Sequence, residues 1–328
     1  MRTLGADGVA CCLFHIVLLR SHIYFTMVPD EDLPTLIKRQ DHLQVLRYVR
    51  AHELREPTLV VKHGKALLGE NLKKKLDDEA SRLAALEQLC LAALDVANHD
   101  LAELCLNQLK EKVAVDSARF RRLLGRCLEA AGDLEGADKI YDVLLKDNPA
   151  CVVALQRKYC VARAQKKEPE KVIAALNDYL GQQMSDVSAW YEMATLRMAL
   201  GDFKGAAHAL EQVVLGCPLE SKIHTQLAEV YATIGGLEYL ELARKHMAQA
   251  LELDATNVRA QFGLVSVANQ YLEAAATASK KDIDDHEQLV AKELVKYGAA
   301  QVLQSYKGTK MLPTVKQVMN DYTDNLEG

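Results

Sequence analysis

The sequence predicts an all-α protein, a right-handed solenoid of stacked helical hairpins with helical N- and C-terminal caps. Three observations lead to this prediction. The 328 residues include only 17 glycines, 7 prolines and 5% aromatic residues, so turns and aromatic-rich strands are scarce relative to average usage. Hydrophobic residues make up 49% of the chain, which is enough for a long continuous core. A repeat of about 34 residues runs through the middle of the sequence.

The repeat is visible when residues 118–149 are aligned with residues 187–218. The aligned pairs are Gly125 with Ala194, Gly132 with Gly201, Asp133 with Asp202, Ala137 with Ala206, and Pro149 with Pro218. A further unit fits between the two segments, at 153–186. One position in the second helix of each unit recurs 35, 35, 34 and 37 residues apart, at Ala102, Ala137, Val172, Ala206 and Ala243. A unit of this length is one helical hairpin, which buries its apolar face by stacking on its neighbours.

Small residues are expected where the helices of a hairpin cross, because a small side chain lets two helix backbones approach closely. Gly-Asp turns would close the hairpins, and a proline would stop the second helix. The segment between Tyr231 and Ala243 is three residues longer than its neighbour, which predicts an enlarged turn. The residues expected to pack the repeats are Gly125, Ala137, Tyr141, Trp190, Ala194, Ala206, Ala228 and Ala243.

Composition shifts suggest four parts. They are an N-terminal extension (1–26), an N-terminal helical segment (27–80), the repeat array (81–275) and a C-terminal helical cap (276–328). The apolar run from Val9 to Leu19 in the extension is shorter than the roughly 20 residues that span a bilayer. Met27, where acidic and helical sequence begins, is the more natural start.

Several function classes are disfavoured. A net charge of −5 and a pI near 6.1 do not provide the positive field that nucleic-acid binding requires. The eight cysteines form no CxxC pair and are interpreted as small core residues. No nucleotide-binding, zinc-protease or hydrolase motif is present. The acidic group at 282–287 is interpreted as a solvated helix start. We therefore expect no enzyme activity and no catalytic, cofactor or metal site.

The repeat resembles the tetratricopeptide repeat, in which a tryptophan, small residues and a final proline recur at fixed spacing. The unit at 187–218 matches this pattern at Trp190, Ala194, Ala206 and Pro218. Within the array, the segment GGLEYLELARK at 235–245 is similar to the family of subunit 2 of the endoplasmic reticulum membrane complex. The resemblance covers roughly residues 80–275.

The resemblance implies a non-catalytic cytosolic scaffold subunit of a membrane insertase, on the cytoplasmic face of the endoplasmic reticulum membrane. Such a complex places tail-anchored and multi-pass proteins in the membrane. The implied partners are the other subunits of the complex, held on a curved helical-repeat surface, with membrane contact only indirect through them. The alternative is a co-chaperone adaptor that binds chaperone C-terminal peptides. That function needs a clamp of lysines and asparagine, and Arg126 and Val161 occupy the asparagine position in successive units.

One basic group stands apart from the apolar pattern. Arg119, Arg122 and Arg126 fall within about 60° of one another on a helical wheel, and Arg157 occupies a related position in the next unit. Two interpretations remain open. These arginines could dock an acidic partner segment, because guanidinium groups suit bidentate carboxylate recognition. They could instead form a solvated stripe that Glu129 partly neutralises.

Overall fold

The computed structural model describes residues 32–68, 79–277, 285–324 and 326, and within them it contains sixteen helices and no strand. The predicted all-α class is confirmed. The chain divides into two compact units, Met1–Glu168 and Pro169–Gly328. This division falls inside the segment expected to form the array, so the limits 81–275 stay a prediction. The predicted extension at 1–26 lies outside the described residues.

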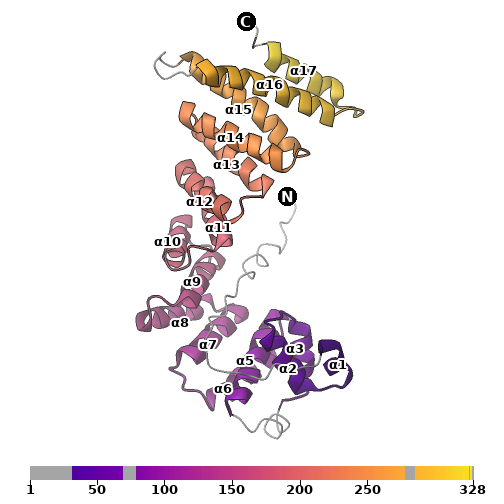
Figure 1. Cartoon of the computed structure of the whole chain (residues 1–328). Helices are drawn as coiled ribbons and strands as arrows, with labels where there is room; N and C mark the ends of the chain where they lie inside the picture. The colour runs from indigo at the N-terminus through magenta and orange to yellow at the C-terminus, as the bar shows by residue number, and fades with distance from the viewer. Residues whose placement is uncertain (1–31, 69–78, 278–284, 325, 327–328) are drawn as a thin grey trace. The chain divides into compact units, whose positions relative to one another are not determined.

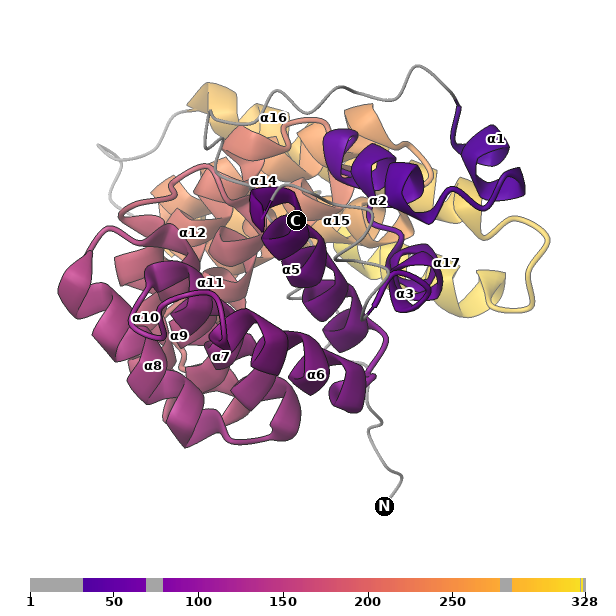
Figure 2. The same cartoon turned by 90° about the horizontal axis from the view of Figure 1, so that it is seen from below.

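In the described residues of the first unit, three short N-terminal helices are followed by five longer ones (Figure 1). They are α1 (Leu33–Lys38), α2 (His42–Ala51), α3 (Pro57–Lys65), α5 (Glu79–Asp95), α6 (His99–Lys110), α7 (Ala118–Ala131), α8 (Leu134–Asp147) and α9 (Val152–Ala164). Helices α5 and α6 pair, as do α7 and α8, and α7 packs against both α5 and α6 (Figure 2). Consecutive hairpins therefore stack within this unit.

Where the structure describes the second unit, the same plan continues in eight helices. They are α10 (Pro169–Leu180), α11 (Val187–Ala199), α12 (Phe203–Gly216), α13 (Ser221–Ile234), α14 (Leu237–Leu253), α15 (Val258–Thr277), α16 (Asp285–Ser305) and α17 (Leu312–Asp324). Helices α15, α16 and α17 pack one after another at the C-terminal end (Figure 1). In the part of the chain that the structure describes, no helix combines the length and hydropathy of a membrane span.

Small residues lie at the helix crossings, where the repeat pattern places them. Ala137, Ala206 and Ala243 are completely buried, as are Ala194 and Ala228. The contact is close at Gly125, where an added Cβ would lie 2.7 Å from the ring of Tyr141. Only glycine permits that approach.

Trp190 has a different environment from the alanines. Its side chain is half-buried, and its indole N–H donates a hydrogen bond of 2.9 Å to the carbonyl oxygen of Met184. The ring of His208 meets it edge-on with centroids 6.0 Å apart. The tryptophan thus fastens the loop before α11 to the helix.

A residue with a positive φ angle follows the first helix of each repeat hairpin that the structure describes. The positions are Ala97, Gly132, Lys166, Gly201 and Gly235, with φ values of 55°, 84°, 52°, 76° and 74°. Each comes 34 or 35 residues after the previous one. At three of the turns the next residue is an N-cap whose side chain accepts a backbone N–H, namely Asn98, Asp133 and Asp202. The positive φ angle therefore recurs once in each repeat, with the same spacing as the sequence pattern.

The prediction of an enlarged turn in the fourth unit is wrong. The turn between α13 and α14 is only Gly235-Gly236. The extra residues lengthen α14 at its start instead, so six residues precede Ala243 in that helix, whereas three precede Ala206 in α12. Leu237-Glu238-Tyr239 continues the helical pattern, and extending a helix satisfies more backbone groups than a longer loop would.

Lys166→Gly tests the cost of the left-handed turn. A side chain in this conformation is strained by about 1–2 kcal/mol. Glycine removes the strain, but it also raises the conformational entropy of the unfolded chain, which offsets part of the gain in stability. We expect Lys166→Gly to raise the free energy of unfolding by about 0.5–1 kcal/mol and Gly132→Ala to lower it by about 1 kcal/mol, measured by urea unfolding. Lys166→Ala is the control and should change little. Equal effects of the alanine and glycine variants at 166 would contradict the strain argument.

Candidate interaction surface

Two arginines of α7 face carboxylates of α5 in the first unit. The Arg119 Nη2 lies 2.9 Å from Glu87 Oε2, and its Nε binds the other oxygen of the same carboxylate. Two turns further on, the Arg126 Nη2 lies 3.9 Å from Asp95 Oδ1. Asp95 also has the Arg55 Nε at 3.8 Å. These ion pairs join neighbouring hairpins and hold two of the four predicted arginines in place.

Arg157 is held by a carboxylate network of its own. Its Nε donates to Glu129 Oε1 at 2.9 Å, its Nη2 binds the other oxygen, and the Tyr141 hydroxyl donates to Glu129 Oε1 at 2.5 Å. Glu129 was expected beside Arg126, but its carboxylate reaches Arg157. Although burial works to lower the pKa of Arg157, the Glu129 hydrogen bond and charge raise it overall. Burial and Glu129 raise the pKa of Tyr141.

Arg122 and Arg126 differ in their surroundings. Burial and the charge of Arg157 lower the pKa of Arg126, and Asp95 opposes that shift. The Arg122 Nε donates to the carbonyl oxygen of Ala118 in its own helix at 3.1 Å. Among the described residues no carboxylate forms an ion pair with Arg122. Of the four predicted arginines, Arg122 is therefore the one best able to meet an external carboxylate.

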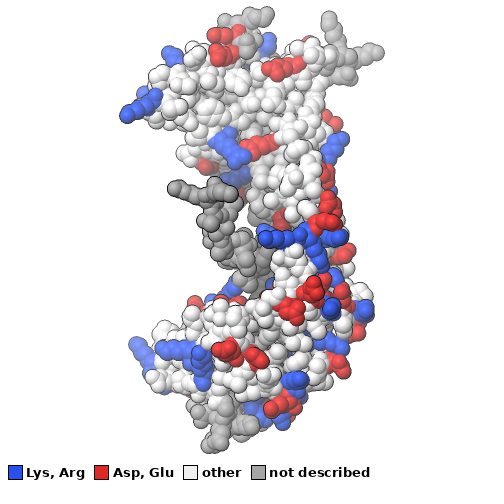
Figure 3. Space-filling view, turned by 180° about the vertical axis from the view of Figure 1, so that it is seen from behind, with Lys and Arg blue, Asp and Glu red and all other residues white. Residues whose placement is uncertain are grey.

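Figure 3 shows acidic and basic side chains interspersed rather than gathered into areas of one sign.

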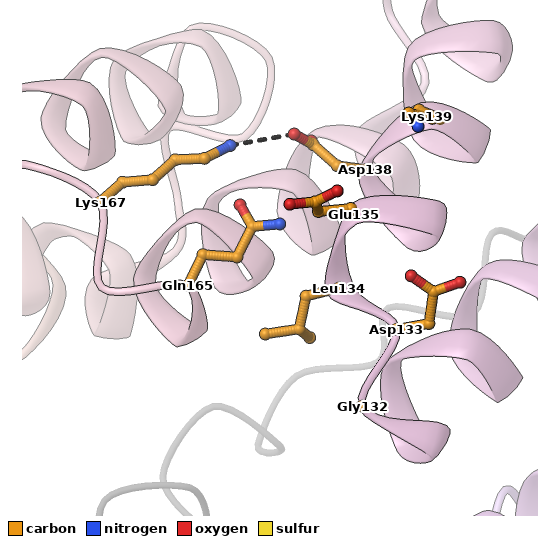
Figure 4. A pocket seen from close by; sticks show the side chains of 8 residues that line it. All are labelled: Gly132, Asp133, Leu134, Glu135, Asp138, Lys139, Gln165 and Lys167. Atoms are coloured by element: carbon orange, nitrogen blue, oxygen red, sulfur yellow. Dashed lines mark hydrogen bonds and ion pairs between the residues drawn. The ribbon is translucent and has the colours of Figure 1, made fainter.

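The open cleft between the start of α8 and the end of α9 is also lined by side chains of both charges (Figure 4). There the Lys167 Nζ lies 2.9 Å from Asp138 Oδ2, with Glu135 and Gln165 beside them. Three acidic residues and two lysines line this cleft, and Lys167 pairs with Asp138 there, so the cleft offers no large charge of one sign to select a ligand.

Sequence reasoning missed a buried arginine in the second unit. Arg244 of α14 donates to the carbonyl oxygen of Glu287 at 2.9 Å and also binds the Glu287 carboxylate. Its guanidinium lies 4.7 Å from the centre of the Tyr271 ring. Glu287 was interpreted as part of a solvated helix start, and that interpretation is wrong for this residue. No local pattern signals the pair, because 43 residues separate its members.

Each unit also contains a pair of histidines that joins two helices. The Nδ1 atoms of His224 and His246 lie 2.9 Å apart, and His224 Nε2 lies 3.0 Å from the Pro218 carbonyl oxygen. Because a carbonyl can only accept, His224 Nε2 carries the proton and its Nδ1 accepts from His246. Burial and His224 lower the pKa of His246, while Glu211 opposes the shift. In the first unit the Nδ1 atoms of His42 and His63 are also 2.9 Å apart.

No group of three or more His, Cys, Asp or Glu in the described ranges is placed to hold a metal ion.

The sequence is similar to one family of repeat proteins. Residues 98–237 match the family described as "EMC2 TPR-like repeat domain", which together with the helical hairpins confirms the predicted tetratricopeptide-repeat fold. ER membrane protein complex subunit 2-A of Xenopus laevis is 35% identical over 271 residues, covering 82% of this chain and 86% of that protein. ER membrane protein complex subunit 2 of Dictyostelium discoideum is 30% identical, covering 64% of each. A solved structure of MamA from Desulfovibrio magneticus, 19% identical, has a TM-score of 0.40 over 53% of this chain and 96% of that one.

Glu129→Gln tests the carboxylate network. The amide keeps an acceptor but removes the charge that faces a largely buried guanidinium, so we expect a loss of about 1–3 kcal/mol in the free energy of unfolding. Tyr141→Phe removes one hydrogen bond and should cost about 1 kcal/mol. Urea unfolding of the full chain gives both values. If Glu129→Gln lowered the free energy of unfolding no more than Tyr141→Phe, the ion pair between Glu129 and Arg157 would contribute little to stability.

The histidine pair predicts acid sensitivity. The pKa of His246 is lower in the folded chain than in the unfolded one, so the unfolded chain binds more protons as the pH falls below about 6.5. Stability from this group is present above that pH and is lost as the pH falls through the folded pKa. We expect the melting temperature to decline more between pH 7.5 and 5.5 for the natural chain than for His246→Gln. Identical pH profiles of the two chains would rule out this coupling.

Proposed function

The chain belongs to the ER membrane protein complex subunit 2 family, and on this premise we propose that it is a non-catalytic scaffold subunit of that complex. The observation that carries the proposal is the extent of the relationship. The chain covers 86% of the Xenopus laevis protein at 35% identity, so nearly the whole repeat array is shared. A helical-repeat array offers a long surface that can hold several partners.

Exposed apolar side chains support a role in assembly. Met184, Leu215 and Leu219 in the second unit are 75%, 75% and 81% exposed. They lie near the point where the end of α12 meets the start of α11, since a Cβ at Gly216 would touch Val187. Single exposed apolar residues are ordinary, but a group of large ones favours a protein interface.

The proposed location is the cytoplasmic face of the endoplasmic reticulum membrane, reached through the other subunits of the complex. Its role there would be to hold those subunits while the complex inserts tail-anchored and multi-pass proteins. Arg122, flanked by the fixed guanidinium groups of Arg119 and Arg126, would contribute to docking an acidic segment of one partner.

The co-chaperone alternative is disfavoured by geometry. Val161 is buried and the Arg126 guanidinium faces Asp95. Neither position can offer an asparagine amide or a free cation to a peptide carboxylate.

Affinity purification from detergent-solubilised microsomes tests the scaffold proposal. We expect the natural chain to bring down a stoichiometric set of membrane-complex subunits. Arg122→Glu should reduce recovery of at least one subunit by about tenfold, because a charge reversal at a docking site adds repulsion to a lost pair. Lys139→Glu, at an exposed position of α8, is the matched control and should leave recovery unchanged.

Each outcome has a distinct meaning. Recovery of chaperones alone would refute the scaffold proposal and favour the adaptor. Full recovery with Arg122→Glu would leave the scaffold intact but remove Arg122 from its docking surface. The test reverses Arg122 alone, because Arg119→Glu would place a carboxylate against Glu87 and so disturb folding.

A further inference from the structure

Three cysteines from successive helices meet in the first unit. Cys90 lies on α5, Cys105 on α6 and Cys127 on α7. The sulfur atoms of Cys90 and Cys127 are 3.9 Å apart, within thiol hydrogen-bond distance, and Cys90 Sγ lies 3.6 Å from the Ala102 carbonyl oxygen. Cys90 and Cys105 are completely buried, whereas Cys127 is partly exposed. Packing alone does not require two thiols in contact.

We propose that Cys90 and Cys127 form a redox-active dithiol, which hydroperoxides oxidise to a disulfide that links α5 to α7. This inference is independent of the scaffold function. It depends on the contact between the two sulfur atoms and on their unequal exposure. Cys90 and Cys127, which are 37 positions apart in sequence, would then act together in an oxidation reaction.

Cys127 is the thiol that attacks the oxidant. Its pKa is lowered, first by the hydrogen bond from Cys90 and then by the charge of Arg126, against the effect of burial. The same hydrogen bond and burial raise the pKa of Cys90. Burial and Cys127 raise the pKa of Cys105 to about 12. The reactive form is the thiolate, so the less buried member of the pair is also the one more readily ionised.

The reaction proceeds in two balanced steps. The Cys127 thiolate attacks the outer oxygen of a hydroperoxide. An S–O bond forms, the O–O bond breaks, and the alkoxide or hydroxide that leaves takes up the thiol proton. The Cys90 sulfur then attacks the Cys127 sulfenic acid, an S–S bond forms, and water leaves with the Cys90 proton. The two thiols lose two electrons and two protons, and the peroxide is reduced to an alcohol or water, plus one further water.

Closing the bond requires little rearrangement. A disulfide holds its sulfur atoms about 2.05 Å apart, so the two must approach by about 2 Å. Helices α5 and α7 already pack against each other. The bond would enclose α6 in a covalent loop and prevent the α5–α6 hairpin from separating from α7. Oxidation should therefore raise the melting temperature of the first unit.

Peptide mapping of the full chain after treatment with hydrogen peroxide tests the proposal. Free thiols are alkylated before digestion without reductant. We expect a cross-linked peptide that contains Cys90 and Cys127, which dithiothreitol separates. Cys105→Ser should still form it. In Cys90→Ser the sulfenic acid on Cys127 has no resolving thiol, so dimedone labelling of Cys127 should rise several-fold over the natural chain. Cys217, which is exposed, serves as an internal reference for an ordinary surface thiol.

Three results would overturn the proposal. The first is a natural chain in which Cys90 and Cys127 remain fully alkylated after Cys217 is oxidised. The second is a cross-link that joins Cys105 to either partner in place of the Cys90–Cys127 bond. The third is dimedone labelling of Cys90 rather than Cys127. The mapping of the natural chain decides the question even if a serine variant fails to fold.

Discussion

Close contact between small side chains at each helix crossing is the constraint on which the rest of this structure depends. Ala137, Ala206 and Ala243 are completely buried, and the ring of Tyr141 occupies the space that a side chain at Gly125 would need. Because the helices of a hairpin approach so closely, neighbouring hairpins can share a continuous core. The turns must then recur at a fixed interval, which explains why the left-handed conformation recurs even where the residue is Ala97 or Lys166.

Charged side chains reinforce this stacking between hairpins. Arg119 with Glu87, and Arg157 with Glu129, are pairs whose members come from different hairpins. They are partly buried, so breaking one leaves a poorly solvated charge. Their cost in desolvation limits the net stability they contribute, but they fix how the helices lie against each other. Most of the predicted arginines therefore pair with carboxylates of the chain itself, and Arg122 is the one that we propose for partner docking.

In the second unit, different interactions hold neighbouring helices against one another. Arg244 connects α14 to α16 through Glu287 and contacts the ring of Tyr271 from α15. His224 and His246 join α13 to α14. The dithiol of Cys90 and Cys127 is a comparable link between α5 and α7 in the first unit. Contacts between helices are therefore where we expect the chain to respond to acid, at the histidine pair, and to oxidants, at the dithiol.

The amino-acid sequence alone was enough to predict the helical class, the repeat period and small residues that the fold buries in the array. These features follow from local patterns, such as a small residue at a fixed spacing, or Pro149 two residues after α8 ends at Asp147. It did not determine which carboxylate binds which arginine, the partner of Arg244, or the contact between Cys90 and Cys127. The extra residues before Ala243 were also misassigned to a turn. Each of these points depends on how helices far apart in sequence rotate and stack against one another. Because no local pattern encodes that geometry, they emerge only from the folded arrangement.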